Sequence, residues 1–208
     1  MPVNVREQKK RDRKQRIFEV AMEYFRLRGF QETTILDIAT TARVSRGTVF
    51  NYYPYKEAIL IEYFARFLQD LGVRVAVRAA RRDPVENLYY LFGELASFVE
   101  ENALLILPLS YELLNPDPER SRIAFHSLPL VPIIQEYLGK ARAQGLARRD
   151  FSTERLSRMI ANTFFLTALQ WATYRRELSI HEELRKALQI MLEGLLLKTP
   201  RPVGDGLG

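Results

Sequence analysis

Polar side chains gather on one side of a short segment within Ile38–Leu60, IATTARVSRGTVFNYYPYKEAIL. Arg46, Thr48 and Asn51 fall on one side of the helix that this segment predicts, and Val49 falls on the other. Arginine and asparagine can each form paired hydrogen bonds with the edges of guanine and adenine in the major groove. Serine, threonine and tyrosine hydroxyls suit phosphate oxygens. The segment therefore predicts contact with duplex DNA.

Two short helices joined by a tight turn are expected to position this edge. The first starts near Thr34, because Thr34 and Asp37 stand three residues apart in a variant of the capping box. Ser45 can cap the second helix, which runs to about Tyr53. The small or apolar residues at which the two helices would cross are Ile38, Ala39, Ala42, Val44 and Val49. This is the pattern of a helix-turn-helix, whose second helix enters the major groove.

The rest of the chain also predicts helices. An amphipathic helix over about residues 9–27 precedes the motif, and Gly29 stands where a C-terminal cap belongs. A long helix over about residues 55–82 follows it. Further helices are expected from Asp83, over about residues 104–114, over about 119–144 with interruptions at Pro129 and Pro132, over about 160–172, and at the end of the chain. No strand pattern is found, so the chain is predicted to be all-α with about nine helices.

Positive charge is unevenly distributed along the chain. The formal net charge is +6, of which residues 1–60 hold +5 and residues 61–208 hold +1. Lysine and arginine gain free energy on a phosphate backbone by releasing its counterions, so this bias favours a nucleic-acid partner. A solvated basic tail and a basic helix lying on anionic lipid are the two alternatives.

Composition excludes several kinds of site. The chain has no cysteine, its two histidines are far apart, and no nucleophile motif or metal-ligand spacing occurs. We therefore expect no catalytic residue, no metal and no cofactor. The charged N-terminus lacks the apolar stretch of a signal peptide, and no apolar run reaches the length of a membrane span, so a cytoplasmic protein is expected.

The motif resembles that of the tetracycline-repressor (TetR) family of bacterial regulators. The resemblance rests on Gly29-Phe30, Thr33-Thr34, Ile38-Ala39 and above all VSRGTVFNYYPYKEAIL, and it covers about residues 10–60. It implies a helix-turn-helix DNA-binding domain over residues 1–54 and a ligand-binding and dimerisation domain over 55–198. Residues 199–208 are rich in proline and glycine and are expected to form a flexible tail. It also implies a transcriptional regulator, most simply a repressor.

The resemblance assigns roles to individual side chains. Base or groove contacts fall to Arg46, Thr48 and Asn51, and phosphate contacts to Thr34, Ser45, Tyr52 and Lys56. Val49 and Tyr53 match positions that pack the small domain. Two departures stand out: Arg43 replaces the usual glycine of the turn and is a candidate phosphate contact, and Phe50 replaces the more usual tyrosine.

The C-terminal part is expected to bind a second copy of the chain and a small effector. An apolar helix followed by an amphipathic one suits a four-helix seam in a homodimer, with Leu184, Leu188, Met191 and Leu195 in the interface. A largely apolar effector, such as an acyl-coenzyme A, would release the repressor from its operator DNA. Arg81, Arg82, Arg148 and Arg149 are candidates for its anionic head group. The candidate pocket residues are Tyr89, Phe92, Phe98, Leu107, Tyr111, Phe125, His126, Asn162, Phe164, Phe165 and Trp171. The alternative is a basic protein of the membrane surface without an effector switch.

Overall fold

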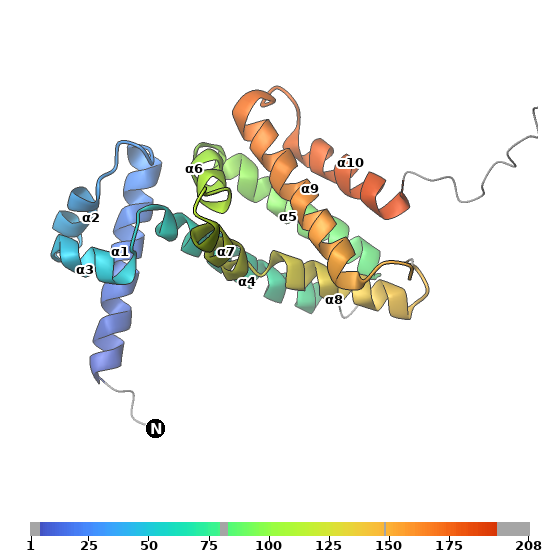
Figure 1. Ribbon diagram of the computed structural model, residues 1–208, viewed down its shortest axis with the longest axis horizontal. Coiled ribbons are helices and arrows are strands. Elements are labelled where there is room, and N and C mark those ends of the chain that lie inside the picture. The colour runs from blue at the N-terminus through green and yellow to red at the C-terminus, as the bar shows by residue number, and fades with distance from the viewer. Residues whose placement is uncertain (1–4, 80–82, 148, 195–208) are drawn as a thin grey trace, which may run out of the picture.

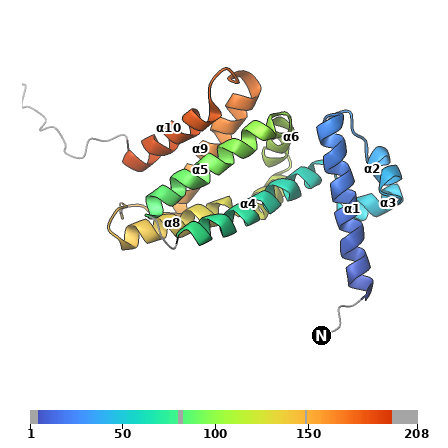
Figure 2. The same cartoon turned by 180° about the vertical axis from the view of Figure 1, so that it is seen from behind.

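A computed structural model describes residues 5–79, 83–147 and 149–194 of the chain, and within these ranges all regular structure is helical. A small domain of three helices lies at one end of the molecule, and the remaining helices form a bundle beside it (Figures 1 and 2). The ten helices are α1 (Val5–Leu27), α2 (Ile35–Thr41), α3 (Arg46–Tyr52), α4 (Glu57–Ala79), α5 (Pro84–Glu101), α6 (Ala103–Leu113), α7 (Pro118–Ser127), α8 (Leu130–Ala143), α9 (Thr153–Tyr174) and α10 (Ile180–Glu193).

Side-chain caps define the two helices of the motif. Thr34 and Asp37 form the predicted capping box at α2, since the Thr34 Oγ1 accepts from the Asp37 N–H at 3.1 Å and the Thr34 N–H donates to Asp37 Oδ2 at 2.9 Å. The Ser45 hydroxyl caps α3 by accepting from the Thr48 N–H at 3.1 Å. These bonds satisfy amides that a helix start otherwise leaves without partners. Both helix starts predicted from the sequence are thereby confirmed.

The small domain has a continuous apolar core. Ile17 and Phe25 of α1 pack with Ile38 of α2 and Val49 of α3, and all four are buried. Tyr53, just after α3, is also buried, which confirms the packing role expected for Val49 and Tyr53. Because α3 packs on α2 and buries Val49 in this core, the polar side of α3 is held outward.

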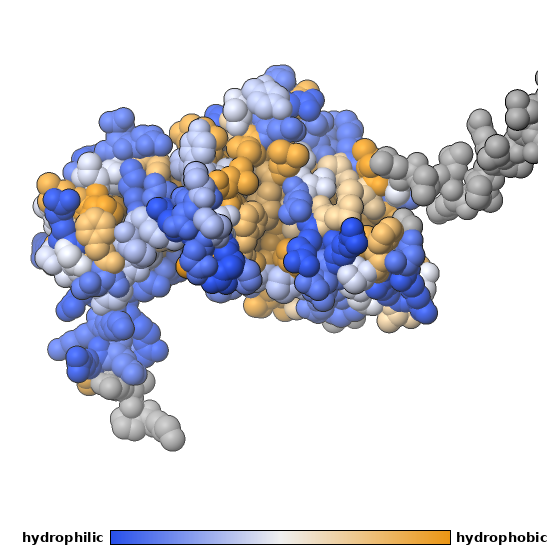
Figure 3. Space-filling view, viewed as in Figure 1, coloured by the Kyte–Doolittle hydropathy of each residue, from blue (hydrophilic) through white to orange (hydrophobic). Residues whose placement is uncertain are grey.

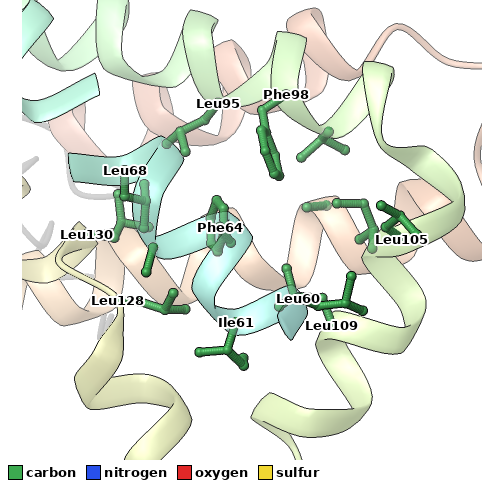
Figure 4. Packing of buried hydrophobic residues seen from close by; sticks show 14 of the residues in the cluster. Leu60, Ile61, Phe64, Leu68, Leu95, Phe98, Leu105, Leu109, Leu128 and Leu130 are labelled. Carbon is green, nitrogen blue, oxygen red and sulfur yellow. The ribbon is translucent and has the colours of Figure 1, made fainter. Parts of the chain in front are cut away.

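Helix α4 connects the small domain with the bundle. Its buried side chains follow the helical repeat through Leu60, Phe64, Leu68 and Leu71. Figure 4 shows Phe64 between side chains of the surrounding helices, with Phe98 of α5 beside it. Since α4 contacts α1 as well as α5, α6 and α7, it is the element through which the two parts meet.

The segment over residues 119–144, in which interruptions at Pro129 and Pro132 were expected, forms two helices, so the described residues hold ten helices where about nine were predicted. The break falls at Leu128 and Pro129, between α7 and α8. Pro129 precedes the first turn of α8 and Pro132 lies within it, where a missing N–H leaves no bond unmade. Asp117 caps α7 with its side chain. The prolines thus divide the segment without straining either helix.

Helices α9 and α10 complete the bundle. The indole Nε1 of Trp171 donates to the carbonyl of Leu178 at 2.7 Å and so fastens the connection between them. Helix α10 packs on α5 and α9, and α9 packs on α6, α8 and α10. Across the described ranges, no helix is both long enough and apolar enough to cross a membrane.

Candidate functional site

Helix α3 presents the polar edge as a solvent-facing surface. Arg46 and Asn51 are exposed at its start and near its end. Thr48 is half-buried, and its hydroxyl lies 2.9 Å from that of Ser45. Arg46 and Asn51 therefore carry the donors and acceptors best placed to reach base edges, while Ser45 and Thr48 also hold the helix start together.

The expected phosphate contacts differ in their availability. The Thr34 hydroxyl donates its proton to Asp37 Oδ2 at 2.6 Å, and this bond and the Thr34 backbone bond lower the pKa of Asp37. Thr34 can therefore donate to a phosphate only if the capping box opens. Tyr52 is half-buried at the end of α3 and borders a hollow next to α1.

Arg43, which replaces the usual glycine of the turn, adopts the left-handed backbone conformation. Its φ is 54°, and its side chain is exposed. For a residue other than glycine this conformation costs roughly 1–2 kcal/mol. The exposed guanidinium lies in the turn between α2 and α3.

Lys56 is positioned differently from a residue that contacts phosphate. Its Nζ donates to the backbone carbonyls of Phe30 at 2.6 Å and Thr33 at 2.9 Å, with Gln31 at 3.4 Å, and it lies 4.2 Å from the centre of the Phe30 ring. Burial lowers its pKa. Its three N–H groups are thus engaged within the chain, and Lys56 holds the segment before α2 against the start of α4. The structure therefore shows a structural role for Lys56, and its expected phosphate contact stays a prediction.

Two ionic networks that sequence reasoning missed lie near the junction of the small domain and the bundle. In the first, Glu62 of α4 binds Lys14 of α1 at 2.7 Å and Arg66 at 2.5 Å, and Arg66 also donates to Gln15 at 2.8 Å. Burial opposes ionisation of Glu62, but the bonds from Lys14 and Arg66 outweigh it and lower the pKa of the carboxyl. Lys14 lies on α1 and Glu62 on α4, so no regular spacing in the sequence could have predicted their ion pair.

The second network lies between α6, α7 and the segment before α4. Glu112 is 1% exposed and receives two bonds from Arg120, Nε to Oε1 at 3.1 Å and Nη2 to Oε2 at 2.6 Å. Asn115 donates to the same carboxylate at 3.1 Å. The Arg120 guanidinium lies 3.8 Å from the centre of the Tyr55 ring. Burial, and then the Glu112 carboxylate, raise the pKa of Tyr55.

An aromatic cluster fills the centre of the bundle. The Phe64 ring lies 5.1 Å from Phe98 and 6.3 Å from Phe164, and Phe165 lies 5.2 Å from Phe164. Phe125 joins it through Phe165 at 5.8 Å. The structure thus brings together Phe92, Phe98, Phe125, Phe164 and Phe165 of the predicted pocket, around Phe64, which was not predicted.

The cavity within this cluster is almost filled. It is lined from α4, α5, α6 and α9, with Leu109, Ser110 and Ala168 beside the rings, and its volume is about 10 Å³. That is close to the space of a single water molecule, whereas ligand pockets usually span about 300–1,000 Å³. A ligand can enter only if the rings move apart.

Of the predicted pocket residues, Phe98, Phe164 and Phe165 line this cavity and the others do not. Tyr111 and Asn162 are exposed, and the exposed His126 places Nδ1 2.7 Å from the Arg122 carbonyl. Trp171 is used in the α9–α10 connection. Tyr89 and Leu107 are half-buried elsewhere in the bundle. Of the four arginines considered for an anionic head group, Arg149 is exposed, and Arg81, Arg82 and Arg148 lie outside the described residues.

The predicted interface on the last helix needs correction. Leu184 and Leu188 are fully buried within their own chain against α5 and α9, so they cannot meet a second copy. Met191 is half-buried, and Leu195 lies outside the described residues, as does the expected tail over 199–208. The apolar side chains that α9 and α10 turn outward include Met159, Leu166, Tyr174 and Ile190.

Comparison with known sequences assigns the chain to a family. Three helices with an exposed α3 edge, joined to a helical bundle, define a helix-turn-helix regulator. Residues 17–63 match the family model for bacterial regulatory proteins of the tetR family, and residues 66–194 match that for the C-terminal domain of TetR/AcrR family transcriptional repressors. The chain belongs to the TetR/AcrR family and is a DNA-binding transcriptional repressor, not an enzyme.

Individual relatives agree with this assignment. The crystal structure of the TetR-family repressor FadR from Thermus thermophilus, in complex with lauroyl-CoA, is 51% identical, covers 92% of this chain and 100% of that one, and has a TM-score of 0.85. FadR from Bacillus subtilis with stearoyl-CoA shares the fold at 20% identity, 88% and 99% coverage and a TM-score of 0.71. The repressor DhaR of Mycobacterium sp. (strain GP1) is 25% identical over 191 residues, which are 89% of this chain and 93% of DhaR.

Proposed function

We propose that this repressor releases its operator when an acyl-coenzyme A inserts its acyl chain into the aromatic cluster around Phe64. The observation that carries the proposal is an apolar cavity lined by rings and aliphatic side chains of four helices, in a chain 51% identical to a repressor that binds lauroyl-CoA. A saturated chain gains free energy there by leaving water, at about 0.8 kcal/mol for each buried CH₂. The family assignment replaces the alternative of a membrane-surface protein.

Insertion of the chain would act on DNA through α4. Because the cavity is nearly filled, the ligand must displace Phe64, which lies on α4, or the rings that pack against it. Helix α4 contacts α1 and is joined to the small domain by the Glu62 network. A tilt of α4 therefore moves α3, whose edge carries Arg46 and Asn51.

The geometry of DNA makes such a movement effective if the repressor is a homodimer. Two reading helices must lie about 34 Å apart, one turn of the duplex, to occupy both half-sites. We assign the dimer contact to the outward faces of α9 and α10. Leu166 and Ile190 are more than half exposed there, and apolar side chains gather over the region of α7 and α9 in the space-filling view (Figure 3). Two copies of this helix pair would bury them in a four-helix seam.

Linked equilibria test this proposal. Lauroyl-CoA is titrated into the protein alone and into its complex with an operator fragment selected from genomic DNA. Affinity should be lower on the complex, because a ligand that weakens DNA binding must itself be weakened by DNA to the same extent. Free coenzyme A, which has no acyl chain, should bind at least tenfold more weakly. Equal affinity for lauroyl-CoA with and without operator would refute the switch.

A substitution in the cavity wall locates the ligand. Ala168 is buried and lines the cavity, so Ala168→Met occupies the space that the acyl chain needs. Because the cavity is nearly filled, the added side chain must push the rings apart as the ligand would, so the variant should bind operator more weakly without any ligand and respond less to lauroyl-CoA. Unchanged release would place the ligand elsewhere.

A further inference from the structure

The first half of α1 extends beyond the small domain. All the buried residues of α1 lie between Ile17 and Phe25, so residues 5–16 contribute nothing to the core. Twelve helical residues are about 18 Å long, close to five base-pair steps of duplex DNA. Figure 1 shows this part of α1 projecting past α2 and α3, and it is hydrophilic in the space-filling view (Figure 3).

This extension holds the excess positive charge of the DNA-binding part. Residues 5–16 contain seven lysines and arginines and two acidic residues, which is a balance of +5. Residues 17–60, which hold the helix-turn-helix, contain five of each and are neutral. The charge bias that indicated nucleic acid therefore lies outside the motif that reads it.

Three of the cations face the same way as the buried side of α1. Lys9, Lys10 and Arg13 precede Ile17 by eight, seven and four residues, which are helical spacings for one face. They are exposed and, with Tyr52 at the end of α3, border a hollow of about 1050 Å³. No ion pair reaches these three within the described ranges, whereas Lys14, on another side, is paired with Glu62.

We propose that the α1 extension is a second DNA contact, which binds the phosphate backbone beside the bases read by α3. Two observations select this partner. The hollow has a single carboxylate, Glu7, among four cations, so it suits a polyanion. It is also continuous with α3 through Tyr52, so one duplex can contact both surfaces. Phosphate contacts carry no sequence information, so the extension supplies affinity and α3 supplies selectivity.

Salt dependence tests the proposal directly. The variant Lys9→Gln/Lys10→Gln/Arg13→Gln is compared with the unaltered protein on the selected operator and on a mixed-sequence duplex of about three turns. Each phosphate contact contributes about 0.9 to the slope of log K against log salt, so the slope should fall by up to about 2.7 per protomer. Both duplexes should lose affinity by the same factor, and the preference for operator should remain.

A matched variant separates contact from net charge. Arg122→Gln/Lys140→Gln/Arg149→Gln removes three exposed cations from α7, α8 and the segment before α9 and should leave the slope unchanged. The inference is wrong if the α1 variant keeps the original slope, or if the control lowers it equally. It also fails if the extension instead drives binding to vesicles of anionic phosphatidylglycerol while the α1 variant retains full DNA affinity. Absence of any duplex binding by the unaltered protein would refute DNA recognition itself, and this contact with it.

Discussion

The turn between α2 and α3 stores strain at Arg43, whose φ is 54°. Glycine adopts this conformation without a Cβ penalty, so Arg43→Gly should raise the free energy of unfolding by roughly 1 kcal/mol. Thermal or urea unfolding measures it, and Thr41→Gly, in the last turn of α2, should have the opposite effect. A less stable Arg43→Gly protein would show that the arginine side chain makes a compensating contact. Arg43 is exposed on the helix-turn-helix motif. If it contacts phosphate, Arg43→Gly should lower operator affinity while it raises the free energy of unfolding.

Gly47 allows a test of how closely α3 approaches DNA. A Cβ at this exposed helical position would have ample space, with Ser45 Oγ nearest at 3.9 Å. Gly47→Ala should therefore stabilise the free protein by roughly 0.5–1 kcal/mol, since alanine favours a helix. Its methyl group would lie between α3 and the groove, so operator binding should weaken at least several-fold. Fluorescence anisotropy with labelled operator gives the result, and unchanged affinity would place the contact surface away from Gly47.

At the scale of elements, the Glu62 network makes the junction of α1 and α4 sensitive to acid. The pKa of Glu62 is lower in the folded protein than its ordinary value of 4.5. Its stabilising effect is therefore complete above the unfolded pKa and disappears as pH falls through the folded one. Glu62→Gln should lower the free energy of unfolding at pH 7 and have a smaller effect near pH 3.

Urea unfolding at both pH values measures this difference. The exposed Glu101→Gln variant, on α5, serves as a control and should change little at either pH. An equal destabilisation by Glu62→Gln at pH 7 and pH 3 would mean that packing, and not charge, connects α1 with α4.

Sequence predicts these elements well where the determining signal is local. The Thr34 and Ser45 caps, the turn at Arg43 and the break at Pro129 all depend on residues a few positions apart. Leu188 shows where such reasoning stops. Its helical spacing correctly indicates a buried face, but spacing does not say whether the cover is the same chain or another. Lys56 and Glu62 depend on partners that only the folded chain brings together.

Sequence predicted the aromatic residues of the candidate pocket better than its polar ones. Aromatic residues on apolar stripes were expected to meet, and Phe98, Phe164 and Phe165 do. Polar residues between them, such as Asn162, were expected inside but lie on the outer side of their helices. The volume left between packed rings is set by how helices cross, and composition carries no information about that.

At the scale of the whole molecule, we propose that the outward faces of α9 and α10 form the dimer contact that lets two DNA-reading helices act together. Leu166→Glu places a charge on an exposed position of α9 and should dissociate the dimer and abolish tight operator binding. Val77→Glu, at a position of α4 that is more exposed than Leu166, should do neither. Light scattering and operator binding are measured on both variants. A Leu166→Glu protein that remains dimeric would place the interface elsewhere, and Leu188→Glu is unsuitable because it would disrupt the core.

For the acyl-coenzyme A that we propose as effector, the nearly filled cavity makes binding depend on the length of the acyl chain. Separating the rings around Phe64 costs a fixed amount of free energy, whatever ligand enters. The free energy gained by burying the acyl chain grows by about 0.8 kcal/mol with each methylene group. We therefore expect a threshold in chain length, below which an acyl group cannot offset the cost of opening. A two-carbon acyl group would leave the repressor bound to its operator at any ordinary concentration. An acyl chain of about twelve carbons would release it. A repressor with so little empty space in its unliganded state would therefore respond selectively to acyl-coenzyme A molecules with long acyl chains.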